Sequence, residues 1–300
     1  MIHLAFNDPV VSWRETNYAC VKGLGSGGSA KVYSMLATSG LLKGQLFAVK
    51  FFIAQAKSDR WHSNFMKEIH FLRSCDHPAI IRVFDEGILD KQFPFVVMEH
   101  MQGSLDDLYK RKIDLVDSRK ISIVVQLLSA LNYLSRLDPP GVHCDIKPKN
   151  ILFKGTSCVL SDFGLVALRH SEDDPESWSP PDALPQAQCY RTPELVPFSD
   201  RGTPFPPASD VFQLGLVATE LFTGMNPLNP KGKDKKVELN PPGTVPGKHA
   251  DTITALLMDM LNRDTDSRIS ARDALRRWQE LLVASYAPDP SKPQIPRKRT

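Results

Sequence analysis

The sequence has 300 residues, of which 42% are hydrophobic and 24% charged, so the chain is long enough for one large domain or two smaller lobes with real cores. Lys and Arg outnumber Asp and Glu by only 37 to 34, which gives no reason to expect a nucleic-acid partner. The five scattered cysteines exclude a disulfide or zinc framework, and no secretory signal or membrane-spanning run is found, so we expect a cytoplasmic protein without a transmembrane segment.

The first third of the chain carries mostly strand-like patterns. Tyr18–Leu24 and Lys31–Ala37 flank a glycine cluster, which predicts a hairpin. Aromatic and branched residues predict three further strands at Gln45–Ile53, Ala79–Phe84 and Phe93–Met98. The front of the chain is therefore expected to be rich in sheet.

Helical periodicity dominates the rest of the chain. An apolar stripe from Trp61 to Leu72 predicts one helix among the strands. Four more helices are predicted at Ser118–Leu137, Ala208–Phe222, Asp251–Leu261 and Ser270–Leu282. Pro227–Lys248 is rich in Pro, Gly and Lys and is expected to be a surface insertion. The simplest architecture is a sheet-rich front and a helix-rich back, hinged near Glu99–Gly103.

Two front segments carry residues suited to phosphate chemistry. The glycines of Gly25–Val32 let backbone amides approach phosphate oxygens, although such clusters are more often plain hairpin turns. Lys50 lies on a central, apolar strand, where an ammonium needs an anionic partner, and Glu68 on the predicted helix could supply it. Taken alone, a strand lysine is more often an outward-pointing surface residue.

Two later segments carry candidate acid, base and metal-binding groups. In His143–Asn150, the Asp145 and Asn150 side chains can both turn into one cavity. An ordinary polar turn between a helix and a strand would show the same residue pattern. In Ser161–Gly164, the Asp162 carboxylate stands at a strand end before a glycine, which suits magnesium but is also common in turns.

The order of these segments is more specific than any one of them. With Thr192-Pro-Glu194 at the end, the set resembles the eukaryotic-like protein kinase family, serine/threonine class, with His-Cys-Asp in place of His-Arg-Asp. The resemblance covers Tyr18–Leu282 and implies a bilobal α+β fold, with a small antiparallel β-sheet lobe carrying one helix and a larger, mainly α-helical lobe. It implies an N-terminal extension (1–17), an N-lobe (18–100), a C-lobe (101–286) and a flexible basic tail (287–300).

The resemblance also implies roles for individual residues. Asp145 should accept the proton of the substrate hydroxyl, Lys147 should touch the γ-phosphate, and Asn150 and Asp162 should hold Mg²⁺. Lys50, paired with Glu68, should hold the α and β phosphates of ATP. The full set of expected ATP-binding residues is Leu24, Gly25, Ser26, Gly27, Val32, Ala48, Lys50, Glu68, Met98, Glu99, Met101 and Leu152. The family pattern further implies an ion pair between Glu194 and Arg268, and a buried Asp210 that supports the catalytic loop.

The expected function is a kinase that transfers the γ-phosphoryl group of ATP to a Ser or Thr hydroxyl of a protein. Cys144 replaces the usual arginine and cannot hold a phosphate in bidentate fashion, so we expect activity not to depend on activation-loop phosphorylation, although Ser171, Ser177 and Ser179 lie there. Cys144, together with Ala187 at a usual threonine position, supports the alternative of a pseudokinase acting as a nucleotide-binding scaffold. A small-molecule kinase ranks last. The sequence leaves the protein substrate and the oligomeric state open.

Overall fold

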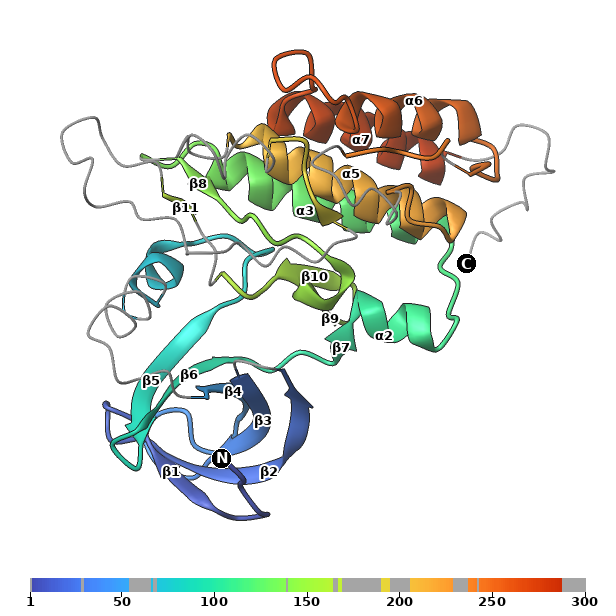
Figure 1. Cartoon of the computed structure of the whole chain (residues 1–300). Helices are drawn as coiled ribbons and strands as arrows, with labels where there is room; N and C mark the ends of the chain where they lie inside the picture. The colour runs from blue at the N-terminus through green and yellow to red at the C-terminus, as the bar shows by residue number, and fades with distance from the viewer. Residues whose placement is uncertain are drawn as a thin grey trace, which may run out of the picture. The chain divides into compact units, whose positions relative to one another are not determined.

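A computed structural model gives the structure of the chain, which it describes for residues 2–27, 30–53, 66, 69–138, 140–163, 167–168, 190–194, 206–228, 237–241 and 243–287 (Figure 1). The chain forms two compact units. The first comprises Met1–Arg111 and Pro148–Val166, and the second Lys112–Lys147 and Ala167–Thr300. The segment after Pro148 thus groups with the sheet-containing unit, and the expected lobe boundary at residue 100 stays a prediction.

The first unit is built on a six-stranded antiparallel sheet with the order β1-β2-β3-β4-β6-β5. Its strands are β1 (Pro9–Val11), β2 (Asn17–Ser26), β3 (Ala30–Ala37), β4 (Leu46–Phe52), β5 (Val83–Leu89) and β6 (Phe93–Glu99). This sheet confirms the antiparallel part of the expected fold. The region expected to be an extension contributes β1, which pairs with β2 from Pro9↔Ala19 to Val11↔Asn17.

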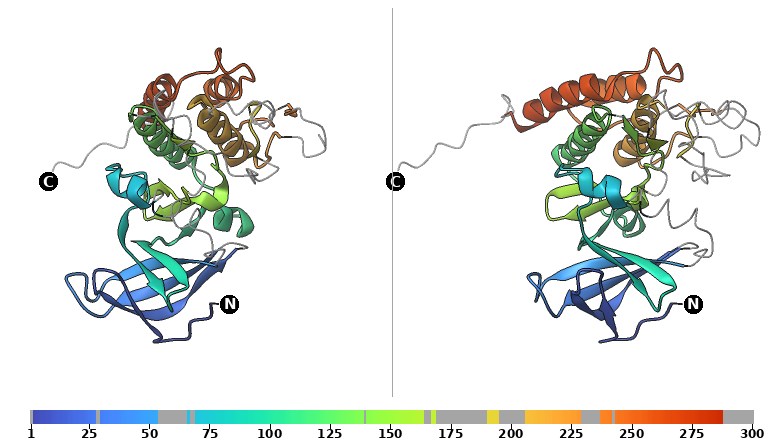
Figure 2. Two further views of the ribbon diagram at one scale, coloured as in Figure 1. Left: turned by 60° about the vertical axis from the view of Figure 1, so that its left-hand side comes forward. Right: turned by 90° about the vertical axis from the view of Figure 1, so that its left-hand side faces the viewer.

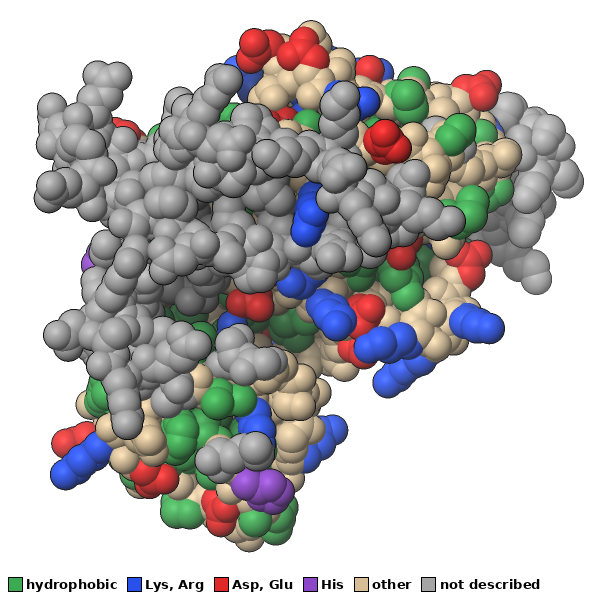
Figure 3. All heavy atoms as spheres, in the orientation of Figure 1, with side chains coloured by type: hydrophobic (Ala, Val, Ile, Leu, Met, Phe, Trp, Pro, Cys, Tyr) green, Lys and Arg blue, Asp and Glu red, His purple; other side chains and the backbone are tan. Residues whose placement is uncertain are grey.

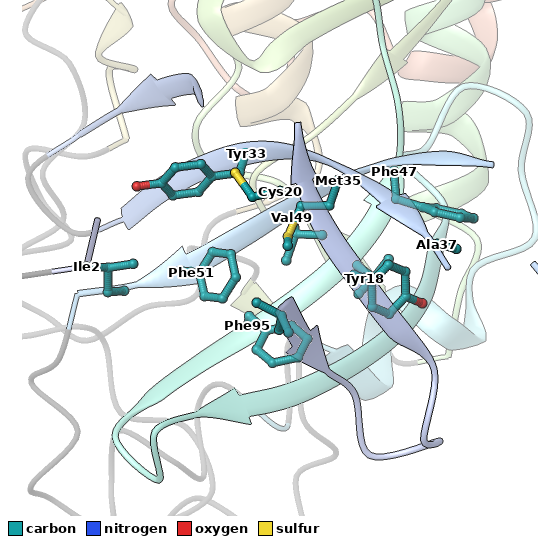
Figure 4. Packing of buried hydrophobic residues seen from close by; sticks show 12 residues of the cluster. Ile2, Tyr18, Cys20, Tyr33, Met35, Ala37, Phe47, Val49, Phe51 and Phe95 are labelled. Carbon is teal, nitrogen blue, oxygen red and sulfur yellow. The ribbon is translucent and has the colours of Figure 1, made fainter. Parts of the chain in front are cut away.

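The two edges of this sheet approach each other and enclose a core. The Trp13 amide, just after β1, donates to the Glu86 carbonyl on β5 at 2.9 Å. Strand side chains alternate between faces, so one side of each strand points into this core. The core cluster consists of Ile2, Val10, Tyr18, Cys20, Tyr33, Met35, Ala37, Phe47, Val49, Phe51, Phe95 and Val97 (Figure 4). Two of its aromatic pairs meet edge to face, Tyr18 with Phe47 at 5.9 Å and Tyr33 with Phe51 at 5.8 Å, an arrangement that adds to simple area burial.

The strand expected at Ala79–Phe84 is wrong: β5 runs from Val83 to Leu89. The apolar residues Ala79, Ile80 and Ile81 are buried, but they lie before the strand. The strand itself carries Asp85 and Glu86, which are buried and bonded to other parts of the chain. Local hydrophobicity therefore identified burial correctly and the strand incorrectly.

The remainder of the first unit comprises a helical segment, a small second sheet and two short helices. Residues 69–74 are helical, and Ile69 packs with Val96 on β6. The second sheet has the order β10-β9-β7, with β7 (Gly103–Ser104), β9 (Ile151–Lys154) and β10 (Ser157–Leu160). Ser104 and Asp107 form a capping box at the start of α2 (Leu105–Lys110), and the short helix η1 (Pro148–Asn150) precedes β9.

The second unit is mainly helical, as expected. Its helices are α3 (Asp117–Leu134), α5 (Ala208–Thr223), α6 (Ala250–Met260) and α7 (Ala271–Tyr286), and each begins within one residue of the range predicted from periodicity. α3 packs against α5 and α7, while α6 packs against α5 and α7 (Figure 2). A two-stranded sheet joins β8 (Gly141–Val142) to β11 (Ala167–Leu168). α5 is apolar and buried on nearly every side, which makes it the central helix of the unit.

Part of the predicted surface insertion belongs to the core of this unit. Leu228 and Val237 are buried and cluster with Phe212 and Leu216 of α5, and Leu228 pairs with Leu239. The prediction of a surface segment at Pro227–Lys248 is therefore wrong for these residues. A Pro- and Gly-rich composition does not reveal the few apolar side chains that a neighbouring helix can bury.

The described surface carries charges of both signs. On the face drawn in Figure 3, lysine and arginine side chains are interspersed with acidic ones, and hydrophobic side chains are exposed on the sheet-containing unit. Among the described residues, no helix combines the length and apolar content that a membrane crossing requires.

Candidate active site

A row of paired residues crosses the sheet and brings several expected ATP-binding residues onto one face. The Cα partners run in register as Gly25↔Val32, Val32↔Lys50 and Lys50↔Val96. Directly opposite residues in antiparallel strands point to the same face, and Ala48, two residues before Lys50, shares it. Ala48 in turn pairs with Met98. Four expected residues, Val32, Ala48, Lys50 and Met98, therefore line the face opposite the aromatic core.

The glycine-rich turn lies at the end of the first hairpin. Leu24, Gly25 and Ser26 end β2, and the Gly27 amide donates to the Ala30 carbonyl at 2.8 Å. A Cβ added at Gly25 would meet no atom within 4 Å, so the protein itself does not require glycine there. Packing therefore does not explain that glycine, and its role in phosphate binding stays a prediction. Residues 28–29 lie outside the described part.

Lys50 forms an ion pair with Asp162. Its ammonium donates to the Asp162 carboxylate at 2.7 Å, with the lysine side chain 14% exposed and the aspartate side chain 45% exposed. Asp162 has a φ of 66°, a left-handed conformation that is uncommon for a residue other than glycine. The pair brings together two residues 112 positions apart. Glu68, the partner expected for Lys50, lies outside the described residues.

The two expected metal ligands lie at the ends of one β-hairpin. In the β9–β10 hairpin, Ile151 pairs with Leu160, and just beyond this pair the Ser161 amide donates to the Asn150 carbonyl at 2.9 Å. Asn150 therefore stands opposite the residue before Asp162. An amide and a carboxylate oxygen are hard donors of the kind that Mg²⁺ prefers, so the donor set at this hairpin end fits that ion. Among the described residues, no group of three or more His, Cys, Asp or Glu side chains could hold a metal.

The segment after β6 connects the main sheet to this hairpin. The Glu99 amide donates to the Arg82 carbonyl at 3.0 Å, and its side chain pairs with Lys154 at 2.9 Å. Met101 is buried, and Leu152 lies on β9 opposite Val159. The expected ATP-binding residues around Glu99 are therefore tied to the hairpin that carries Leu152.

The second unit fixes the loop that carries Asp145. The Lys147 ammonium donates to the Asp145 carboxylate at 2.6 Å. Both carboxylate oxygens of Asp210 on α5 accept backbone amides, from His143 at 2.7 Å and from Cys144 at 2.9 Å. Burial raises the pKa of Asp210 to about 7, while these two amide bonds oppose the rise. The bonds also support Cys144 in its left-handed conformation, with a φ of 65°.

The pair expected between Glu194 and Arg268 is present. The guanidinium contacts the Glu194 carboxylate at 2.5 Å and is fully buried. Burial opposes ionisation of Glu194, but Arg268 and the Thr265 hydroxyl more than offset it, so the pKa of Glu194 lies below its usual value. The expected activation-loop serines and Ala187 lie outside the described residues.

Gln213 is a loop-supporting residue that sequence reasoning missed. Its side-chain oxygen accepts the Ile146 amide at 2.9 Å, and its nitrogen donates to the carbonyls of Cys144 and Tyr190 at 3.1 and 3.0 Å. The signal was available: Asp210 and Gln213 are polar residues three apart in a mostly apolar helix, so they share one face.

Comparison with known proteins agrees with this geometry. Residues 18–278 match the protein kinase domain family. The chain belongs to the protein kinase family. Within this kinase family, the chain is 27% identical over 226 residues to the mouse serine/threonine-protein kinase tousled-like 2, and this match covers 70% of the chain. It is 31% identical over 216 residues to a probable serine/threonine-protein kinase of Corynebacterium efficiens, with the same 70% coverage.

A third kinase extends the match over more of the chain. A probable serine/threonine-protein kinase of Streptomyces coelicolor is 28% identical over 265 residues, or 84% of the chain. The matched regions are 30%, 31% and 38% of the mouse, Corynebacterium and Streptomyces proteins, so the chain spans about a third of the curated relatives it matches. The kinase fold, with an antiparallel sheet and a mainly helical unit, is confirmed.

Proposed function

We propose that this chain is an ATP- and magnesium-dependent protein serine/threonine kinase that transfers the γ-phosphoryl group to a Ser or Thr hydroxyl. The observation that carries the proposal is the Lys50–Asp162 ion pair at 2.7 Å, with Asn150 beside it at the end of the same hairpin. A lysine, a carboxylate and an amide in one place can bind a triphosphate and its counter-ion. Phosphoryl transfer needs such positioning and charge neutralisation more than covalent help.

The first unit supplies the nucleotide-binding groups in this proposal. The row of Val32, Ala48 and Met98 offers an apolar face for adenine, and Lys50 holds the α and β phosphates. The backbone near Glu99 and Met101 offers hydrogen bonds to the base. The remaining proposed nucleotide contacts are Leu24, Gly25, Ser26 and Gly27, which cover the phosphates, and Leu152 below the base, with Glu68 as a further partner of Lys50.

The second unit supplies the groups that act on the substrate hydroxyl. The Asp145 carboxylate accepts the hydroxyl proton, and Lys147, which is bonded to it, contacts the γ-phosphate. Asn150 and Asp162, which belong to the first unit, would hold Mg²⁺, which when bound supplies neutralisation of phosphate charge. Asp210 and Gln213 hold the loop through four backbone groups, so the carboxylate is fixed before substrate arrives.

Phosphate transfer is tested with labelled ATP, magnesium and a generic protein substrate. Wild type should transfer label, and Asp145→Asn should bind nucleotide but transfer at least roughly a hundredfold more slowly, because the acceptor of the hydroxyl proton is weakened. Lys50→Met should lose a similar factor through its electrostatic role. Nucleotide binding by wild type without transfer would instead identify a pseudokinase scaffold, for which Cys144 is the supporting feature.

Independence from activation-loop phosphorylation belongs to the same proposal. Cys144 is buried and donates to the Val142 carbonyl at 3.6 Å, so no guanidinium stands at this position to hold a phosphate. Replacing Ser171, Ser177 and Ser179 together by alanine should leave turnover near that of wild type. A hundredfold drop would reject this part, and phosphatase treatment of wild type is the matched control. We also propose a cytoplasmic location, from the scattered cysteines of the sequence.

A further inference from the structure

A chain of polar residues, three of them buried, crosses the sheet of the first unit. Asp85 and Glu86 are neighbours on β5, and they pair with Val97 and Val96 respectively. Adjacent strand residues point to opposite faces, so Asp85 faces the aromatic core and Glu86 faces the side on which Lys50 lies. Four residues connect in series and are called the brace below: Ser12, Asp85, Glu86 and Arg73. The link between Asp85 and Glu86 runs from the Glu86 backbone amide to the Asp85 carboxylate at 2.9 Å.

On the core side, the brace begins in the turn that follows β1. The Ser12 hydroxyl donates to the Asp85 carboxylate at 2.5 Å, and the Tyr18 hydroxyl donates to the same oxygen at 3.5 Å. The turn is itself closed by backbone bonds, from the Ser12 amide to the Thr16 carbonyl and from the Glu15 amide to the Ser12 carbonyl, each 3.0 Å. Ser12 and Asp85 are only 5% and 2% exposed, so water does not compete for their bond.

Toward the other face, the brace ends on the helical residues 69–74. The Arg73 guanidinium donates to the Glu86 carboxylate at 2.6 Å, with a second contact to its other oxygen. Burial raises the pKa of Glu86, and Arg73 opposes this rise. A charge-assisted hydrogen bond fixes direction as well as charge, so Arg73 holds its helical segment in one position relative to β5.

The helical segment touches the surroundings of both members of the Lys50–Asp162 pair. Ile69 packs against Val96, which is the residue opposite Lys50 in the sheet. The Phe71 ring lies 6.0 Å from the ring of Phe163, the residue after Asp162. A shift of residues 69–74 would therefore disturb the packing beside each charged partner.

We propose that the brace fixes residues 69–74 beside the Lys50–Asp162 pair, and that Arg73 is thereby a positioning residue for phosphoryl transfer. An apolar contact could stabilise the same unit without selecting one geometry, whereas a directed hydrogen bond defines both partners and their direction. The turn after β1, although distant in sequence, thus becomes part of the active geometry. The catalytic half of this inference rests on the proposed kinase function, while the bracing half does not.

Steady-state kinetics test the catalytic half. Arg73→Ala should lower kcat roughly ten- to hundredfold, since small misplacements of reacting groups have effects of this order, while KM for ATP changes less than about threefold. Arg73→Lys should recover only part of the loss, because lysine keeps the positive charge but lacks the planar guanidinium. Arg82→Ala is the matched control, because Arg82 is a surface arginine of the same unit that lies over the Phe84 ring. A folded Arg73→Ala protein with kcat within about twofold of wild type would overturn the positioning role.

Hydrogen exchange tests the bracing half without any assay of activity. Ser12→Ala should speed exchange of the amides of residues 69–74 by roughly tenfold, because the turn acts on that segment through Asp85 and Glu86. Ser39→Ala is the control, since its hydroxyl accepts the Asn17 amide at an exposed site of the same sheet. Unchanged exchange rates in Ser12→Ala would refute the bracing role of these residues, even if the chain is an active kinase. If wild type transfers no phosphate, the proposed function fails and exchange still decides the brace.

Discussion

Replacing Arg268 by alanine should destabilise the chain far more than the loss of an exposed ion pair such as Arg276–Glu280. The guanidinium is fully buried and makes three directed contacts: with the Glu194 carboxylate at 2.5 Å and with the carbonyls of Ala208 and Asn262 at 2.8 Å each. Its flat face also lies 4.9 Å from the centre of the Phe212 ring. Alanine would leave a carboxylate with little access to water and without its cation.

The magnitude follows from these contacts. Removing one partner of a buried ion pair costs about 3–5 kcal/mol, and each lost carbonyl bond adds up to about 1 kcal/mol. We expect Arg268→Ala to lower the free energy of unfolding by about 4–6 kcal/mol, a large share of the roughly 5–15 kcal/mol typical of a whole protein. Glu194→Gln should cost less, about 1–3 kcal/mol, because the amide still accepts from Thr265 and leaves the two carbonyl bonds of Arg268 intact.

Urea unfolding at several pH values provides the assay. The pKa of Glu194 is depressed in the folded chain, so the unfolded chain binds its proton first as the pH falls. Its contribution to stability is therefore complete above about pH 4.5, the unfolded value, and is lost as the pH falls through the lower folded pKa. The difference between wild type and Glu194→Gln should shrink in acid. A cost of Arg268→Ala below about 1 kcal/mol, or a difference that does not shrink, would refute the reasoning.

Three further changes test other parts of the fold. A Cβ at Gly87 would lie 2.4 Å from the Phe95 ring, so Gly87→Ala should lower the thermal midpoint through overpacking worth about 1–3 kcal/mol; an unchanged midpoint contradicts this. Val10→Ala should cost about 1–3 kcal/mol because Val10 is buried, whereas Val11→Ala, 52% exposed, should change stability by less than about 0.5 kcal/mol; equal effects would show that β1 does not close the core. Asp210→Asn loses one of two amide acceptors and should lower kcat far more than the affinity for ATP, as nucleotide titration and initial rates will show; parallel losses argue against loop support.

The sequence alone predicted the family and much of the fold, and it named the chemical groups of the candidate site. The order of Lys50, Asp145, Asn150 and Asp162 identified the family, and helical periodicity located the four helices that are described in the second unit to within one residue at their starts. These features are local, because a motif or a 3.6-residue period is written in neighbouring positions. The Glu194–Arg268 pair was also expected, from the family pattern, and the structure contains it.

What only the tertiary structure decided are the contacts between distant segments. The residues of β5 are too polar to be predicted as a buried strand, because their partners Ser12 and Arg73 are distant in sequence. The three residues of β1 likewise give no sequence signal that this strand pairs with β2 at the core. Strand register sets which face each side chain meets, and register depends on pairing between strands far apart in the chain. A buried carboxylate is stable only beside its partner, so its place in the sequence cannot be interpreted before that partner is located in space.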